Sequence, residues 1–547
     1  MTDDRPWGSV IEAAWRALEQ GGWEYLLPDG RGRRWLCVDL LRGATTSYLA
    51  PLCASLDTVC LDPAHVADVH ASLHLLEQRN VRVHDGIFPS TAPDGLPFDG
   101  FVLHDLHGCL DEATRERCLA AAQAALGPDG FAFATARNRF GYSRLRERGG
   151  APGTTPAALR RLLGRGHTTL HPFICNADGR LLDVIAPSGY VSAKNPARMG
   201  ERLRRLVLGP SLAPLLSPAF GIVARPDGAP KRLLDLVVDE AVGRGLLAAG
   251  ATFRRWHVLR GGKAIVSLGP PGRGFGQVIA VFARGPQAIG RREREFVMLE
   301  RLADLPANLS GRIPRAHFRT DVAGTPAFLI EELAGITLDA PAPHLEAATR
   351  EAAAFVTRLH VATRRARDFG PDDFERLVDP WIATAESRYP PLADALARLR
   401  PALRSALASQ ALPVVWMHGD YKVENVIIDP SDARLVGVID WEHTQPEGLP
   451  FIDLWYLLLY NREIRYGTHF FPAVEAFTAP ERMPPEFRHA SEKYGKALDI
   501  NAKAWRALAG AFIAHHIGSR VYYPATDPSS MAQIRAAVEA WLAWRET

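Results

Sequence analysis

Residues 414–442 constrain the fold of this chain more than any other segment. Two short apolar runs, residues 414–417 (VVWM) and 435–439 (LVGVI), have the composition of buried β-strands. A third apolar run, residues 426–428 (VII), is joined to the last one by a turn at residues 430–432 (PSD). The pattern predicts a small antiparallel hairpin placed just after another strand.

Three oxygen-bearing side chains follow the ends of these strands. Asp420 lies in the loop after the first strand, Asn425 follows it five residues later, and Asp440 comes directly after the last strand. The hairpin would bring all three to one edge of the sheet. Phosphoryl transfer needs an orienting or basic group for a hydroxyl and oxygen ligands for magnesium, and this segment supplies both.

The same segment resembles a known enzyme superfamily. Its pattern, HGDxxxxN followed by an apolar strand and IDWE, is similar to that of the aminoglycoside phosphotransferases and choline kinases, a branch of the protein-kinase-like fold. The resemblance implies ATP as phosphate donor, Asp420 as catalytic base, and Asn425 and Asp440 as Mg²⁺ ligands. Lys422 has the D-x-K-x-x-N spacing of serine/threonine kinases and would contact the transferred phosphate, with an exposed loop lysine as the alternative.

A nucleotide-binding lobe is expected upstream. Residues 258–266 (VLRGGKAIV) form a strand, a glycine turn and a strand, and glycines allow backbone N–H groups to approach phosphates closely. A helix near residues 290–303 and a hinge-like strand at 327–331 follow. The nucleotide-binding positions that the resemblance implies are Gly261, Gly262, Lys263, Glu295 and Glu331.

One departure from the superfamily concerns the phosphate-binding lysine. Ala280 stands in the strand where that lysine is expected. Either Lys263 or Arg284 replaces it from a neighbouring position, or nucleotide binding is weakened. A degenerate, non-catalytic kinase therefore stays open as an alternative.

The N-terminal third alternates apolar strands with helices, which predicts a parallel sheet covered on both faces. Asp39 ends the first strand, Gly43 lies in the small-residue turn after it, and Asp62 and Asp85 end the next two strands. A small turn and an acid at such strand ends suit a nucleoside ligand. The arrangement resembles class I S-adenosylmethionine-dependent methyltransferases, which implies cofactor contacts from Asp39, Gly43, Asp62 and Asp85. Leu41 occupies a position where that family has a glycine. The domain could therefore have retained methyltransferase activity or be a vestigial methyltransferase domain, and both interpretations stay open.

Composition narrows the remaining possibilities. A chain of 547 residues is too long for one core, and a net charge of +3, from 64 basic and 61 acidic residues, gives no general attraction to nucleic acid. Six cysteines without CxxC spacing favour buried thiols over a zinc site or disulfides. No signal-peptide profile or membrane-spanning run is found, so a cytoplasmic protein is expected.

The sequence therefore predicts a multi-domain chain: an α/β, Rossmann-like methyltransferase fold over residues 1–228, then an α+β, protein-kinase-like two-lobed fold over residues 229–547. The favoured function is an ATP- and Mg²⁺-dependent phosphotransferase acting on a hydroxyl of a small metabolite or glycan. A bifunctional methyltransferase–kinase and a non-catalytic binding or scaffold protein are the alternatives.

Overall fold

The computed structural model describes residues 21–141, 153–164, 166–175, 181–186, 208, 210–227, 230–259, 263–272, 276–322, 324–338, 344–408, 410–466, 483–519 and 528–545. The chain divides into two compact units. Unit 1 comprises Met1–Ser192, Met199–Arg292 and Ala316–Glu332, and unit 2 comprises Ala193–Arg198, Glu293–Arg315 and Leu333–Thr547. The proposed division at residue 228 stays a prediction.

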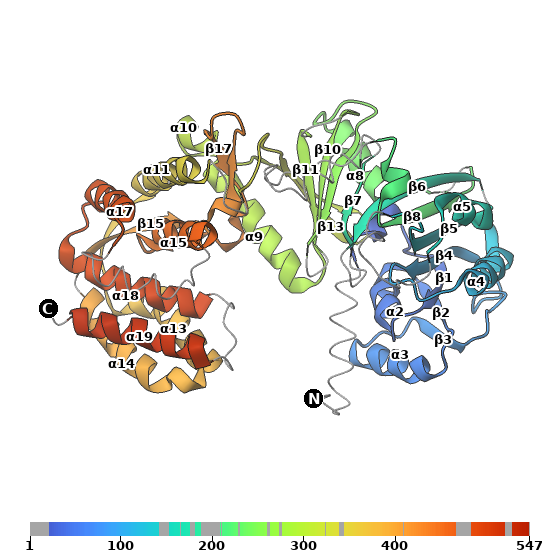
Figure 1. Cartoon of the computed structure of the whole chain (residues 1–547), viewed down its shortest axis with the longest axis horizontal. Helices are drawn as coiled ribbons and strands as arrows, with labels where there is room; N and C mark the ends of the chain where they lie inside the picture. Colours follow the sequence, from blue (N-terminus) through green and yellow to red (C-terminus); the bar gives the residue numbers. More distant parts are fainter. Residues whose placement is uncertain are drawn as a thin grey trace. The chain divides into compact units, whose positions relative to one another are not determined.

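A doubly wound sheet forms the first part of unit 1, as predicted (Figure 1). Its strands run in the order β3-β2-β1-β4-β5-β8-β6, and β3, β2, β1, β4 and β5 are parallel, whereas β8 is antiparallel to both its neighbours. The strands are β1 (Arg34–Asp39), β2 (Ser55–Cys60), β3 (Val81–Asp85), β4 (Phe98–Asp105), β5 (Leu126–Arg137), β6 (His167–Cys175) and β8 (Ala219–Arg225). The strand order reverses between β1 and β4, and in such sheets ligands bind outside the carboxyl ends of the strands at that point.

Local sequence signals define the helices around this sheet. Asp111 caps the start of α4 (Glu112–Ala125) by accepting a hydrogen bond of 2.7 Å from the Thr114 N–H. Thr155 caps α5 (Pro156–Leu163) in the same way, and Gly164 ends that helix with φ of +54°. The other helices of this part are α2 (Ala44–Leu49), α3 (Ala64–Leu75), α7 (Ala213–Leu216) and α8 (Leu233–Gly243), with the short 3₁₀ turns η1 (Glu24–Leu26) and η2 (Ala50–Leu52).

The expected antiparallel strands of the upstream lobe also lie in unit 1. They are β9 (Thr252–Val258), β10 (Ala264–Gly269), β11 (Val278–Phe282), β12 (Ala316–Val322) and β13 (Thr325–Glu331). The sequence did not predict that they continue the first sheet. Strand β7 (Leu181–Val184) pairs with β6 on one side and with β9 on the other, so the described strands of unit 1 form one sheet of thirteen.

Aromatic side chains fill the core where the two parts of this sheet meet. The buried Trp23 ring stacks on His104 at 4.8 Å and on Phe133 at 5.0 Å between ring centres. Arg284, just after the end of β11, places its guanidinium 4.2 Å from the centre of the Tyr48 ring and donates a hydrogen bond to the Tyr48 carbonyl. The Arg284 side chain therefore packs against α2.

Unit 2 is mostly helical and holds two small sheets (Figure 1). Strands β15 (Ala411–Met417), β14 (Arg365–Asp368) and β18 (Gln445–Gly448) form one, and the predicted antiparallel hairpin of β16 (Val426–Ile428) and β17 (Leu435–Val438) forms the other. The chain enters unit 2 within α9 (Pro286–Leu302). The other helices are α10 (Ala307–Ser310), α11 (Leu345–Thr363), α12 (Pro371–Leu377), α13 (Asp379–Arg388), α14 (Ala393–Leu407), α15 (Ile452–Tyr466), α17 (Pro485–Ala497), α18 (Ala502–Ser519) and α19 (Pro528–Arg545), and the 3₁₀ turns are η4 (Pro390–Leu392), η5 (Val423–Asn425) and η6 (Trp441–His443).

All six cysteines are free thiols, and four of them are buried. Cys109 is exposed and Cys175 is half-buried. Within the described ranges, no helix combines the length and the apolar character needed to cross a bilayer.

Candidate functional site

The loop after β15 is held in place by its own histidine. The main-chain N–H of Asp420 donates to His418 Nδ1 at 3.2 Å, and His418 Nε2 lies 3.0 Å from the Ile439 carbonyl oxygen. Because Nδ1 accepts, Nε2 must carry the proton and donate, which defines the neutral tautomer. Gly419 has φ of +81°, and a Cβ there would meet the His443 carbonyl oxygen at 2.5 Å. His418 therefore braces the loop.

Asp420 and Asn425 are in direct contact. The Asn425 Nδ2 group donates to the Asp420 carbonyl oxygen at 2.8 Å and to its carboxylate Oδ2 at 3.2 Å. Both residues are 7% exposed. Since the amide nitrogen faces Asp420, Asn425 Oδ1 is turned away from that carboxylate and has the oxygen lone pairs that a hard cation prefers.

Lys422 brings a positive charge to the same loop. Its Nζ lies 3.5 Å from Asp420 Oδ2 and 3.4 Å from Glu424 Oε2, and the lysine side chain is only 14% exposed. The Nζ atom is also 5.3 Å from the centre of the Tyr460 ring on α15. These contacts do not support the alternative of a solvated loop lysine.

The hairpin places Asp440 beside this pair through the backbone. The Ile439 N–H donates to the Asn425 carbonyl oxygen at 2.9 Å, and Asp440 follows in the left-handed region with φ of 67°. The next main-chain N–H, of Trp441, donates to Glu295 Oε1 at 3.0 Å. The backbone of the residue before Asp440 is therefore bonded to Asn425, which in turn contacts Asp420, and the α9 glutamate lies at the turn that carries Asp440.

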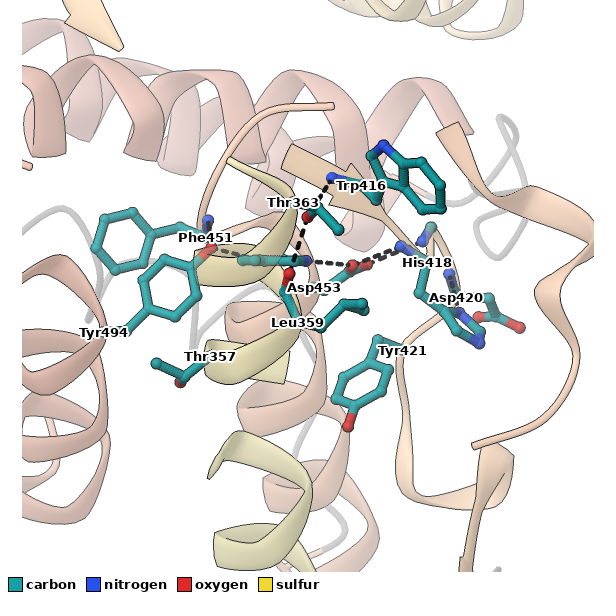
Figure 2. Close-up of polar contacts among 12 residues, drawn as sticks. Thr357, Leu359, Thr363, Trp416, His418, Asp420, Tyr421, Phe451, Asp453 and Tyr494 are labelled. Carbon is teal, nitrogen blue, oxygen red and sulfur yellow. Dashed lines mark hydrogen bonds and ion pairs between the residues drawn. The ribbon is translucent and has the colours of Figure 1, made fainter. Parts of the chain in front are cut away.

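The buried carboxylate of Asp453 holds the loop after β15 in place (Figure 2). Asp453 accepts hydrogen bonds from the main-chain N–H groups of His418 at 2.6 Å and Gly419 at 2.9 Å. His360 Nε2 lies 3.3 Å from its Oδ2, and His360 Nδ1 is 2.5 Å from the Tyr494 hydroxyl. Burial alone would raise the pKa of the Asp453 carboxyl, but His360 and the His418 N–H outweigh it and lower that pKa below its usual value.

Of the predicted nucleotide-binding positions, Lys263 and Glu331 lie in unit 1, whereas Glu295 lies in unit 2. Lys263 precedes β10, and its carbonyl oxygen accepts from the Leu259 N–H at 2.8 Å. Gly261 and Gly262 lie outside the described residues. Glu331 ends β13, opposite Val278 in the register. Ala280 is fully buried in β11, so this strand offers no cation at the expected position.

The glutamate next to Glu331 is well anchored, which the sequence did not indicate. Glu332 Oε1 accepts from Arg255 at 2.8 Å, and its Oε2 accepts from the Gly276 N–H at 2.7 Å and from the Ser267 hydroxyl. It thereby ties the end of β13 to β9 and β10. Strand alternation could have shown only that Glu332 turns inward beside the half-exposed Glu331, and not which groups it binds.

The acids of the doubly wound sheet lie at the carboxyl ends of its strands. Asp39 is buried and accepts from the N–H groups of Leu41, Gly43 and Thr46 and from the Thr46 hydroxyl, all within 3.0 Å. Its carboxylate therefore braces the turn. Asp62 and Asp85 are exposed at the same edge, and Asp62 also accepts from the Ala64 N–H at 3.0 Å.

Gly43 occupies a position that no other residue fits well. It has φ of +93°, and a Cβ there would lie 3.1 Å from Val69 Cα and 3.1 Å from Ser72 Oγ on α3. We expect Gly43→Ala to lower the free energy of unfolding by about 1–3 kcal/mol, measured by urea titration. Gly86→Ala is the matched control, because Gly86 has φ of +63° with no atom within 4 Å of the added Cβ. Equal losses in the two variants would show that contact with α3 is irrelevant.

The oxygen groups near Asp420 fit a magnesium ion better than a transition metal. Among the described residues, no three His, Cys, Asp or Glu side chains converge to form a metal cage. Magnesium is usually held by one or two protein carboxylates or amides, with water and phosphate oxygens completing its octahedron. Asn425 and Asp440 supply that number of ligands.

Residues 245–488 match the family model described as the phosphotransferase enzyme family. The C-terminal part of this chain is a phosphotransferase-family domain. Acyl-CoA dehydrogenase family member 10 of Mus musculus is 29% identical over 178 residues, which are 30% of this chain and 16% of that protein. The probable acyl-CoA dehydrogenase IBR3 of Arabidopsis thaliana is 27% identical over 175 residues, 27% of this chain and 20% of its own length. The chain thus spans a fifth or less of these curated relatives.

Solved structures match each part of the chain separately. The phosphotransferase-family domain is similar to aminoglycoside phosphotransferase APH(3'')-Id from Streptomyces rimosus, at 22% identity over 52% of this chain and 98% of that chain, with a TM-score of 0.31. N-methyltransferase NodS from Bradyrhizobium japonicum, in complex with S-adenosyl-L-homocysteine, is similar at 16% identity over 33% of this chain and 86% of its own, with a TM-score of 0.21.

Proposed function

We propose that the phosphotransferase-family domain transfers a phosphoryl group from ATP to a hydroxyl of a small molecule in a magnesium-dependent reaction. The observation that carries the proposal is the Asp420–Asn425 hydrogen bond, which fixes a buried carboxylate in the loop and leaves the Asn425 carbonyl oxygen for a metal. The hairpin would add Asp440 beside them, because the preceding residue, Ile439, is hydrogen-bonded to Asn425.

Each residue of the loop has a distinct task in this reaction. Asp420 orients the acceptor hydroxyl and takes its proton as the new P–O bond forms and the bond from the γ-phosphorus to the leaving ADP oxygen breaks. Lys422, 3.5 Å from that carboxylate, places a positive charge where charge develops on the transferred group. A bound Mg²⁺ would neutralise phosphate charge. Asn425 and Asp440 would hold it, and the Glu295–Trp441 hydrogen bond would keep the turn around Asp440 in position.

Nucleotide binding would rely on the β9–β10 turn more than in related kinases. Ala280 supplies no charge, and Arg284 packs on Tyr48, so of the two cations that the sequence offered we favour Lys263 as the phosphate-binding one. Gly261, Gly262 and Glu331 complete the proposed nucleotide contacts.

The doubly wound sheet supports a second ligand site. The exposed carboxylates of Asp62 and Asp85 at the carboxyl edge of the sheet favour binding of a nucleoside such as S-adenosylmethionine. The Asp39 carboxylate already accepts hydrogen bonds from the N–H groups of its own turn. Calorimetric titration of the full chain with S-adenosylmethionine tests this proposal. If no heat of binding is measured, the sheet has a structural role only.

The proposed reaction is tested by its metal dependence. With ATP consumption as the readout on a panel of hydroxyl compounds, we expect Asp440→Asn to raise the Mg²⁺ concentration for half-maximal rate at least about tenfold, because a charged ligand becomes neutral. Asp432→Asn, on the β16–β17 turn, is the control and should leave the Mg²⁺ curve unchanged. Superimposable curves for Asp440→Asn and the unmodified protein would remove Asp440 from the metal site.

A further inference from the structure

Three helices of unit 2 enclose a pocket that the proposed chemistry has not yet used. It is lined by residues of α11, α15 and α17 and has a volume of about 840 Å³. This volume is in the range of small-molecule sites in proteins. We call it the α11–α15–α17 pocket.

The lining of this pocket combines apolar and polar side chains and includes a buried amide, Asn461, with one unsatisfied oxygen. Asn461, 5% exposed, donates from Nδ2 to Thr349 Oγ1 at 2.8 Å, and Thr349 donates its own hydroxyl proton to the Leu345 carbonyl oxygen at 2.6 Å. Thr349 can therefore only accept from Asn461, which fixes the amide orientation. Asn461 Oδ1 is left buried without a hydrogen-bond partner among the described residues. A buried acceptor of this kind needs a donor, and a ligand hydroxyl would provide one.

The rim of the pocket is cationic. Five arginine or lysine side chains line it against two carboxylates: Arg350, Arg358, Arg462, Arg465 and Lys493, with Glu346 and Glu486. Glu346 is already paired, at 3.0 Å from Arg350 and 3.8 Å from Arg465. Arg358 and Lys493 are exposed and make no ion pair with any residue that the structure describes. The excess positive charge suits an anionic group.

The pocket and the catalytic loop share two helices. Tyr421 donates its hydroxyl to the Ala352 carbonyl oxygen on α11 at 2.8 Å, and Ala353 lines the pocket. Lys422 lies over the Tyr460 ring on α15, and the next residue is Asn461. A ligand seated in the pocket is therefore next to the elements that hold Asp420.

We propose that the α11–α15–α17 pocket binds a small amphipathic anion: a hydroxylated molecule with an apolar chain and a phosphate or carboxylate group. The apolar chain would contact side chains such as Leu458 and Phe487, the anion would lie between Arg358 and Lys493, and a hydroxyl would donate to Asn461 Oδ1. The idea that this molecule is the phosphoryl acceptor depends on the proposed function. Its binding in the pocket is proposed independently of that function.

Calorimetry on the full chain tests the binding with three probes: 8-hydroxyoctanoate, 8-hydroxyoctyl phosphate and 8-amino-1-octanol. The two anions should bind and the amine should not. Lys493→Glu and Arg358→Glu should each weaken anion binding by about five- to twentyfold, since each reverses a charge on a partly solvated rim. Lys496→Glu is the matched control on the same helix, because Lys496 does not line the pocket.

The outcomes separate the pocket from the chemistry. Binding of the anions that persists in Asp420→Asn, together with its loss in Lys493→Glu, supports the pocket whether or not ATP is consumed. Failure of both anions to bind, equal binding of the amine, or an unchanged Kd in Lys493→Glu and Arg358→Glu overturns it. Anion binding without any ATP consumption would instead count against the proposed acceptor role alone.

Discussion

Asp420→Asn is expected to reduce phosphoryl transfer by about 10²–10⁴-fold, because an amide of the same shape cannot take the proton of the acceptor hydroxyl. Asp420 is buried and in direct contact with Asn425, the proposed metal ligand, and its carboxylate is the proposed proton acceptor. The measurement is kcat with ATP and the best acceptor from the panel.

The effect should fall on kcat alone. The amide oxygen that the substitution introduces can still accept from Asn425, so the melting temperature and the KM for ATP should stay near those of the unmodified protein. Asp432→Asn serves as the control for removing a surface carboxylate from the same region. Full turnover in Asp420→Asn would show that another group accepts the proton.

Asp453→Ala is expected to lower the free energy of unfolding by about 3–5 kcal/mol, the range found when one member of a buried ionic network is removed. Two main-chain N–H groups, of His418 and Gly419, would lose their acceptor in a dry interior, and His360 would lose its carboxylate. Urea unfolding of the full chain measures the loss. Asp432→Ala should cost far less, and a loss of similar size there would contradict the argument.

The same residue predicts how stability depends on pH. The pKa of Asp453 is lowered in the folded protein, so its contribution to stability is complete above the unfolded pKa of about 4 and is lost as the pH falls through the folded value. The unmodified protein should therefore lose stability below about pH 4 more steeply than Asp453→Ala. Parallel pH profiles for the two proteins would show that the carboxylate is not charged in the fold.

Much of the fold followed from local patterns in the sequence. The apolar strands of the doubly wound sheet and the β16–β17 hairpin were predicted because strand periodicity and turn residues are local signals. The pairing of β7 with β9 was not predicted, since β7 is a short strand and its partner lies far away in the sequence. Register between distant strands depends on packing that no short window contains.

The candidate site was likewise predicted from the sequence only in part. Spacing and the family resemblance predicted Asp420, Asn425 and Asp440 as site residues, because loop and hairpin lengths determine where such residues meet. Spacing could not show that Glu295 binds the Trp441 N–H or that Glu332, next to Glu331, anchors the end of its strand. Those roles depend on which buried donors remain unpaired after folding, and donors from distant segments are invisible in the sequence.

The β7–β9 ladder also has an evolutionary consequence. A gene rearrangement that separated the doubly wound sheet from the phosphotransferase-family domain would leave the β9 edge uncovered beside the buried Trp256 and Val258. Exposed edges of this kind recruit strands from other chains. We therefore expect a chain cut between these two parts to be less soluble than the intact chain, independent of whether both parts perform chemistry.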